Sequence, residues 1–157
     1  MRKKIIGEET AFKTTAGEKW LDLEQLARVE VTSEDDSHPI EGALIPGLEA
    51  GWRAAEPGEQ IIRLLFDSPQ KIRQIHLEFI ENECERTQEY VLRWSPDQGE
   101  SFREIVRQQY NFSPGGASTQ VEDYQVDLAG VTTLELKIVP HVGGGEAVAS
   151  LRQFQVA

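Results

Sequence analysis

Cysteine is almost absent from this 157-residue chain, in which Cys84 is the only one. A single thiol forms no internal disulfide, so the fold must depend on a packed core. Cysteine usage of this kind is typical of proteins that stay in a reducing compartment. We therefore expect a cytoplasmic protein.

Long apolar runs are also missing. No stretch approaches the roughly 18 apolar residues that a membrane-spanning helix requires. The N-terminus, MRKKIIGEET, begins with positive charge as an export signal does, but Ile5-Ile6 is its only apolar stretch. A signal peptide carries an apolar region of about 7–15 residues. The sequence therefore predicts neither membrane insertion nor export through a signal peptide.

Basic side chains are outnumbered, with 16 Lys and Arg against 27 Asp and Glu, and the formal net charge is -11. Such a charge repels polyanions. A nucleic-acid groove would require a concentrated basic stripe. Apart from Arg2-Lys3-Lys4, the basic residues are dispersed along the chain. We predict no nucleic-acid partner.

Recognisable catalytic and metal-binding motifs are absent as well. The three histidines lack the spacing of metal ligands, the glycine run at 143–145 lacks the Lys-Ser/Thr of a phosphate loop, and there is no G-x-S-x-G motif. Cys84 lies between two glutamates, whose charge raises the pKa of a thiol and suppresses the reactive thiolate. The sequence predicts no catalytic residues and no metal ligands.

What the sequence does contain is a series of short segments in which apolar and polar residues alternate or in which an apolar run stands between turn signals. Both patterns are typical of β-strands. Few signals favour helix; the exception is a short helix over 22–26 with Asp22 as its cap. Residues 33–51 are rich in turn formers and predict a loop, and Asp67-Ser68-Pro69-Gln70 predicts a turn. The expected strands are 27–31, 61–66, 75–79, 90–94, 102–106, 124–128, 134–138 and 151–156.

These elements predict an all-β protein. About eight strands with one apolar face each form two antiparallel sheets packed face to face, and a β-sandwich of the jelly-roll type is the expected architecture. We place this domain at residues 21–157. Residues 1–20 are predicted to be an N-terminal arm, with Trp20, Leu21 and Leu23 as anchors to the body of the domain.

One hairpin carries a resemblance to a known family. YVLRWSPDQG, residues 90–99, is followed by Phe102. It resembles the "tyrosine–hydrophobic–Ser–x-Asp-Gly–aromatic" hairpin of the discoidin domain, also called the coagulation-factor C domain, although Gln98 separates the Asp from the Gly. This domain is the galactose-binding-like jelly roll shared with family 32 carbohydrate-binding modules. The resemblance covers about residues 27–156 and implies a fold, because this fold hosts sugar, lipid, peptide and protein binders. We interpret the aromatic residues of the hairpin as core.

The same resemblance implies a structural calcium site, but two expected ligands are missing. Pro46 stands where the family has an Asp, and Gln153 stands where it often has a Glu. Calcium requires hard, anionic oxygen ligands. We therefore predict no cofactor. The acidic run Glu34-Asp35-Asp36 either supplies carboxylates in another way or forms a solvated loop.

The resemblance also implies a ligand site built from loops at one end of the sandwich, where aromatic rings combine with polar side chains. Sugars suit such a site because their C–H faces stack on rings while their hydroxyls need donors and acceptors. The alternative is that the aromatic candidates are core and that the arginines pair with acids. The candidate ligand-binding residues are His38, Trp52, Arg53, Arg86, Gln88, Arg107, Tyr110 and Asn111.

Two functions follow from this interpretation. The first is a non-catalytic binding module for a carbohydrate or another small polar ligand, held by loops at one end of the sandwich. The alternative is an intracellular protein–protein interaction module without a sugar ligand, in which residues 1–19 pair with a neighbouring subunit.

Overall fold

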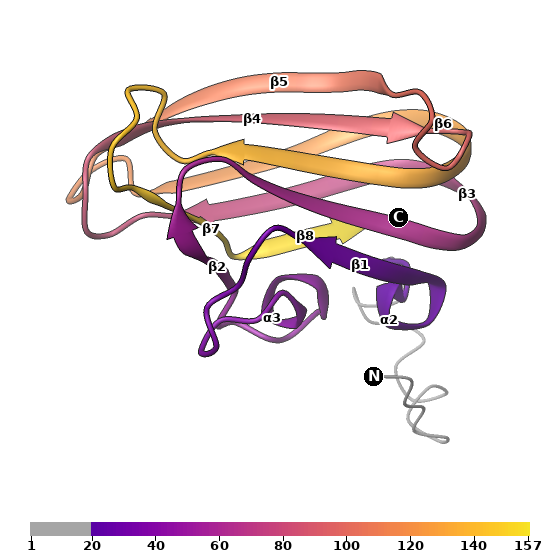
Figure 1. Cartoon of the computed structure of the whole chain (residues 1–157), viewed down its shortest axis with the longest axis horizontal. Helices are drawn as coiled ribbons and strands as arrows, with labels where there is room; N and C mark the ends of the chain where they lie inside the picture. The colour runs from indigo at the N-terminus through magenta and orange to yellow at the C-terminus, as the bar shows by residue number, and fades with distance from the viewer. Residues whose placement is uncertain (1–19) are drawn as a thin grey trace.

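The computed structural model describes residues 20–157, so the predicted arm lies outside the described residues except for Trp20. Eight strands and two single-turn helices make up this part of the chain (Figure 1). Across residues 20–157, neither helix has the length or apolar character needed to cross a lipid bilayer. The elements are α2 (Leu23–Leu26), β1 (Ala27–Val31), α3 (Glu41–Leu44), β2 (Trp52–Pro57), β3 (Gln60–Ile80), β4 (Arg86–Ser95), β5 (Arg103–Phe112), β6 (Thr119–Val139), β7 (Val148–Leu151) and β8 (Gln153–Val156).

The strands pair into the antiparallel sandwich that the sequence predicts. One sheet has the order β1-β3-β6-β4-β5, with β8 also paired to β3, and a second small sheet consists of β2 and β7. Helix α2 begins after Asp22 as predicted, although the Asp22 side chain makes no capping hydrogen bond. The predicted loop at 33–51 contains the single turn of α3.

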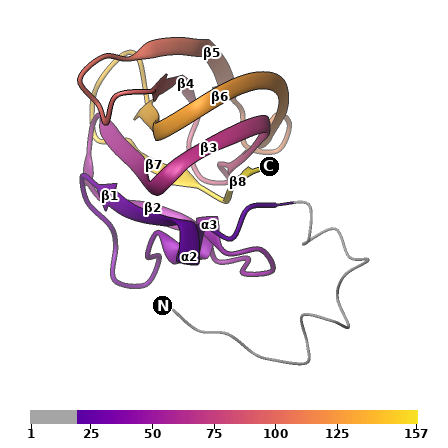
Figure 2. The same cartoon turned by 90° about the vertical axis from the view of Figure 1, so that its right-hand side faces the viewer.

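Strands β3 and β6 each serve both layers of the sandwich. The predicted turn at 67–70 does not interrupt the ladder, because β3 stays paired with β6 through several register shifts between Leu65 and Gln74. Figures 1 and 2 show both strands folding back at this place. Irregularities of this kind let a strand bend sharply while its pairing continues. Two predicted strands therefore become one long strand, in β3 and again in β6.

The core lies between the two layers. Phe79 of β3 and Tyr90 of β4 stack with their ring centroids 5.1 Å apart, and both side chains are buried. The Tyr90 hydroxyl hydrogen-bonds the Tyr124 hydroxyl of β6. Burial and this contact raise the pKa of Tyr90 far above its ordinary value. Tyr90 and Trp94 are core residues, as predicted. The prediction is wrong for Phe102, whose ring is only partly buried and lies 4.2 Å from the Arg93 guanidinium.

The hairpin of β4 and β5 contains an irregularity in its pairing. The register shift between Leu92 and Arg93 adds one residue on β5, so Val106 stands opposite Leu92 while Glu104 stands opposite Arg93. The strand predicted at 102–106 thus begins one residue later and contains an irregularity: Glu104 is exposed, whereas Val106 packs against the core.

The outer face of the larger layer carries a row of alternating charges across neighbouring strands. Glu135 of β6 is fully buried there, because Arg63 donates to it from one side at 2.7 Å and Arg93 from the other at 2.8 Å. A buried carboxylate requires such partners. The two arginines therefore make the buried Glu135 side chain a part of the packed structure.

Candidate ligand-binding site

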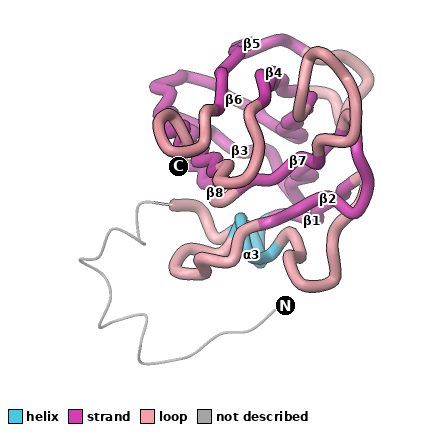
Figure 3. The backbone as a smooth tube through the Cα atoms, turned by 90° about the vertical axis from the view of Figure 1, so that its left-hand side faces the viewer, coloured by secondary structure: helices cyan, strands magenta, loops and turns pink. Residues whose placement is uncertain are grey.

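Several loops meet at one end of the sandwich, the end that faces the viewer in Figure 3. The backbone N–H of Glu81, after β3, donates to the carbonyl of Ser118, before β6, at 2.8 Å. The Thr87 N–H at the start of β4 donates to Nδ1 of His141, after β6, at 3.1 Å. These bonds bring loops from distant parts of the sequence to the same end.

The small sheet of β2 and β7 forms one wall at this end. Trp52 pairs with Leu151, and Arg53 pairs with Ser150. Gly51 precedes this pairing with φ +72°, and a Cβ there would lie 2.8 Å from the Leu151 carbonyl oxygen. Only glycine combines that backbone conformation with so close an approach. Gly51 therefore fixes where Trp52 and Arg53 enter the sheet.

A pocket of about 240 Å³ opens beside this wall. We call it the loop pocket. It brings together three of the eight predicted site residues and three that the sequence analysis missed, over Ile80 and Leu151. The six residues that define it are His38, Glu49, Trp52, Arg53, Ser150 and Arg152.

The loop pocket holds positive, negative and neutral polar groups. Nδ1 of His38 lies 3.2 Å from an Asp35 carboxylate oxygen, and this hydrogen bond, with one from the Ser37 backbone, lowers the pKa of Asp35. The backbone N–H of Arg152 donates to the Glu78 carbonyl at 2.8 Å. Its Nε is buried and has no hydrogen-bond partner among residues 20–157. The arginine is therefore fixed at its backbone while part of its guanidinium is left without a partner.

Trp52 is buried rather than displayed. Only 1% of its surface is exposed, and its indole N–H donates to the Ser33 carbonyl at 3.0 Å. Trp52 therefore supports the pocket from within the core, as the alternative interpretation of the sequence held. Arg53 is exposed, and its N–H donates to the His38 carbonyl at 3.2 Å.

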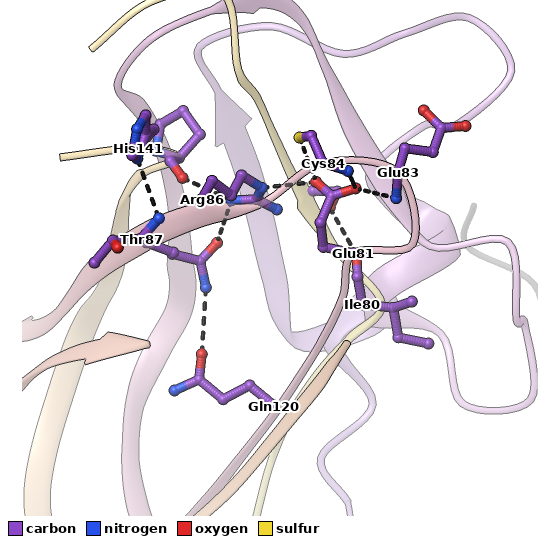
Figure 4. A network of polar contacts seen from close by, with 11 residues as sticks. Ile80, Glu81, Glu83, Cys84, Arg86, Thr87, Gln120 and His141 are labelled. Atoms are coloured by element: carbon purple, nitrogen blue, oxygen red, sulfur yellow. Dashed lines mark hydrogen bonds and ion pairs between the residues drawn. The ribbon is translucent and has the colours of Figure 1, made fainter. Parts of the chain in front are cut away.

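Arg86 and Gln88 lie in a buried polar network next to the loop pocket but outside its lining (Figure 4). Arg86 Nε donates to Glu81 at 2.7 Å, and its Nη1 donates to the Pro140 carbonyl at 2.8 Å. Gln88 accepts from Nη1 at 3.2 Å and donates to Gln120 at 3.4 Å. The guanidinium also stands 4.7 Å from the centre of the Phe112 ring. The structure gives both residues a role in joining loops.

The charges around Glu81 also govern Cys84. Burial alone would raise the pKa of Glu81, but hydrogen bonds from Arg86 and from the Glu83 backbone lower it overall. Cys84 donates its thiol to Glu81 at 3.5 Å. Burial and the Glu81 charge raise the pKa of the Cys84 thiol, in the direction that the flanking glutamates predict.

The remaining three predicted site residues lie on β5, apart from the loop pocket. Arg107 is exposed and pairs with Glu89 at 2.8 Å and Glu104 at 3.1 Å. The Tyr110 hydroxyl donates to a backbone carbonyl, and its ring packs edge-on against Phe112. Asn111 accepts a hydrogen bond from the Thr87 hydroxyl at 2.6 Å. The structure therefore does not bring all eight candidates together.

The region where the resemblance implies calcium does not fit a calcium ion. Gln153 pairs with Glu78, and the residue of β8 that reaches the α3 segment is Gln155. Its amide nitrogen donates to the carbonyls of Ala43 and Leu44 at 3.4 and 3.3 Å. Calcium takes six to eight oxygen ligands, carboxylates among them. Here a neutral amide occupies two of the carbonyl oxygens, and no cluster of three or more His, Cys, Asp or Glu side chains within residues 20–157 is placed to hold a metal.

Sequence comparison identifies no relative: no protein-family model matches the chain, and no curated protein matches it. Solved structures do match. The family 32 module of C. perfringens NanJ, solved with galactose, is 12% identical over 83% of this chain and 92% of that chain, with a TM-score of 0.62. The family 32 module of AlyQ, solved with 4,5-unsaturated mannuronic acid, is 15% identical over 84% and 95%, with a TM-score of 0.61.

A third match is the module CpGH89CBM32-5 from Clostridium perfringens, solved with GalNAc-β-1,3-galactose. It is 21% identical over 83% of this chain and 94% of that chain, with a TM-score of 0.56. At these identities the likeness establishes the fold and leaves the ligand open. The chain has the galactose-binding-like jelly-roll fold of the discoidin domains and family 32 modules, as the sequence resemblance predicted.

Proposed function

We propose that the protein is a non-catalytic binding module and that it takes a carbohydrate or another small polar ligand in the loop pocket. The observation that supports this most is that one pocket of about 240 Å³ is lined by four ionisable side chains, those of His38, Glu49, Arg53 and Arg152. A small-molecule site combines an enclosing surface with a few polar groups that fix orientation. The volume suits a single sugar ring better than a long chain.

The chemistry of the loop pocket suits hydroxyl groups. The two guanidinium groups donate and Glu49 accepts. The Ser150 hydroxyl donates to the Ile80 carbonyl at 3.4 Å, which leaves its oxygen as an acceptor. The buried Trp52 offers no broad stacking surface, so recognition rests on the polar groups, with Ile80 and Leu151 as the apolar contacts. This differs from the aromatic platform that the resemblance implies.

The ligands found in similar structures support a carbohydrate as the ligand of this protein. The NanJ module was solved with galactose and the CpGH89CBM32-5 module with GalNAc-β-1,3-galactose. Proteins of this fold therefore accept neutral sugars rich in hydroxyls. The low identities mean that the particular sugar does not carry over to this chain.

A glycan array followed by titration calorimetry tests the proposal. The wild-type protein is screened with calcium and again with chelator, and we expect a specific glycan whose binding survives chelation. Arg53→Gln should weaken that binding about tenfold or more, because a hydrogen bond to a charged group contributes about 1.5–3 kcal/mol. Arg107→Gln, the matched control on β5, should leave it unchanged.

Three results would count against the proposal. A blank array in both conditions would favour the protein-partner alternative. Loss of binding in Arg107→Gln but not in Arg53→Gln would place the site on β5. A signal that requires calcium would mean that a metal site exists despite the amide of Gln155.

A further inference from the structure

An open apolar groove lies along β1 and shares no lining residue with the loop pocket. Its volume is about 560 Å³, more than twice that of the loop pocket. β1, α2 and α3 lie on the same side of the sandwich in Figures 1 and 2. We call this hollow the β1 groove. It is lined by apolar side chains of these elements, namely Leu23, Ala27, Val29, Val31, Ile40 and Leu44.

The edge of the sheet makes the β1 groove suitable for an extended segment. β1 stands at the end of the strand order and, within residues 20–157, pairs only with β3. Its inward side chains, Ala27, Val29 and Val31, are only partly buried. A half-covered edge strand beside an apolar hollow is the arrangement that accepts an added peptide segment.

The negative charge of the β1 groove indicates which kind of peptide segment could bind there. Its polar lining consists of Ser33 and three carboxylates, those of Glu24, Glu34 and Glu41, and it includes no lysine or arginine. An apolar hollow edged by negative charge favours a segment that combines aliphatic and basic side chains. Such a segment would cover the apolar wall and neutralise the carboxylates together.

Arg2-Lys3-Lys4-Ile5-Ile6, near the N-terminus of the chain, has that composition. The first 19 residues carry five basic and three acidic side chains, whereas the other 138 carry eleven basic and 24 acidic ones. The N-terminal residues are therefore the positively charged part of an acidic protein. They are the part that the field of the domain attracts.

The first described residues lie close enough to the β1 groove for residues 2–6 of the same molecule to reach it. The Leu21 N–H donates to the Val156 carbonyl at 2.7 Å, and Leu23, two residues later, already lines the groove. The 15 steps along the chain from Ile6 to Leu21 span up to about 50 Å when extended. A domain of this length has a radius of gyration of about 15 Å. Chain length is therefore not limiting.

We propose that residues 2–6 of the same molecule bind the β1 groove, with isoleucine side chains on the apolar wall and the basic side chains over Glu24, Glu34 and Glu41. The segment would then cover the edge strand and protect it from pairing with other chains. This inference is independent of sugar binding, because the loop pocket shares none of the residues that line the groove.

Paramagnetic relaxation tests the proposal on the full chain. A nitroxide is attached to Gly7→Cys in a Cys84→Ser background, and amide signals are compared with those of the reduced label. We expect strong loss of intensity at Val29, Val31 and Ile40 and little on β5, which lies four strands away from β1 in the sheet order. Ile5→Asp combined with Ile6→Asp should abolish this loss. Thr14→Asp combined with Thr15→Asp, a control with the same charge change, should retain it.

Two further measurements sharpen the test. Glu24→Gln combined with Glu41→Gln should reduce the intensity loss, and added salt should reduce it as well, because exposed charges are screened. As a further control, isotope-labelled protein without nitroxide is mixed with unlabelled protein that carries the nitroxide. We expect no loss of amide signal intensity in this mixture. Loss in that mixture would assign the groove to a second copy, and absence of loss at β1 in the first experiment would show that the segment does not bind there. Either result would overturn the proposal.

Discussion

Arg86→Met separates a structural arginine from a ligand-binding one. In the wild-type protein the Arg86 side chain is 1% exposed and its ion-pair partner Glu81 is 12% exposed. Methionine keeps much of the volume but removes the donors to Glu81, Gln88 and the Pro140 carbonyl. The variant therefore leaves a nearly buried carboxylate without its cation and a carbonyl without its donor.

The expected cost follows from that geometry. Breaking a buried ion pair by removing one partner costs about 3–5 kcal/mol. Glu81 keeps hydrogen bonds from the backbone of Glu83 and Cys84, so we expect the lower end of that range. A loss of about 3 kcal/mol in the free energy of unfolding lowers Tm by about 6–12 °C for a chain of this length.

Thermal and urea unfolding followed by circular dichroism measure this loss. Arg107→Met is the matched control, because the Arg107 side chain is 51% exposed and its ion pairs contribute less than about 1 kcal/mol. If Arg86→Met were as stable as Arg107→Met and yet lost glycan binding, Arg86 would be a ligand contact and our assignment of it to the structural network would be refuted.

Three further predictions concern single positions. Gly51→Ala should lower the free energy of unfolding by about 1–3 kcal/mol because of its left-handed backbone, and by more because the new Cβ would clash with the Leu151 carbonyl. Gly144→Ala, where φ is +82° and the space is open, should show only the backbone cost in the same unfolding assay. Hydrogen bonds from Ser101 and Ser95 lower the pKa of Asp97 from 3.8 to about 2, so its stabilising effect is present above about pH 4 and lost as the pH falls towards 2. Asp97→Asn should therefore show a smaller fall in Tm between pH 4 and 2 than wild type, and an equal fall would contradict this assignment. Cys84 should react with iodoacetamide with a pH midpoint above that of free cysteine, and Glu81→Gln should lower that midpoint.

Much of the fold could be predicted from sequence because its strands alternate strictly. Ile75, Leu77 and Phe79 predict one buried face, and the structure buries all three. The error at 67–70 has a local cause: Asp-Ser-Pro-Gln has the chemistry of a tight turn, but the ladder between β3 and β6 continues around the bend. Whether two strands stay paired around a bend depends on residues far apart in the sequence, so the local turn residues do not predict it.

Strand β2 shows a second limit. Trp52–Pro57 follows a glycine-rich and proline-rich loop and has little apolar alternation. The sequence predicts no strand there and identifies only Trp52 and Arg53, as candidate site residues. This segment becomes a strand because β7 pairs with it at Trp52, Arg53 and Pro57, with an irregularity between them. The partner comes from the far end of the sequence, so no local window contains the signal.

The candidate site was harder to predict than the fold. The residue types in the loops were informative, since His38, Trp52 and Arg53 do line one pocket. Burial of polar side chains was not predictable: Arg86 and Gln88 have the composition of ligand contacts but lie inside a network. Glu49 and Arg152 were missed because they meet only when β2 pairs with β7. The cytoplasmic location, the choice of ligand and the protein-partner alternative stay predictions.

The most direct test of the central claim is an amide-resolved NMR titration of the isotope-labelled full chain with galactose, N-acetylgalactosamine and a uronic acid. We expect saturable shift changes at His38, Arg53, Ser150 and Arg152 with at least one of these sugars, and none at Arg107 or Asn111. Shift changes confined to β5, or no saturable change with any of the three sugars, would contradict the claim that the loop pocket is a sugar site.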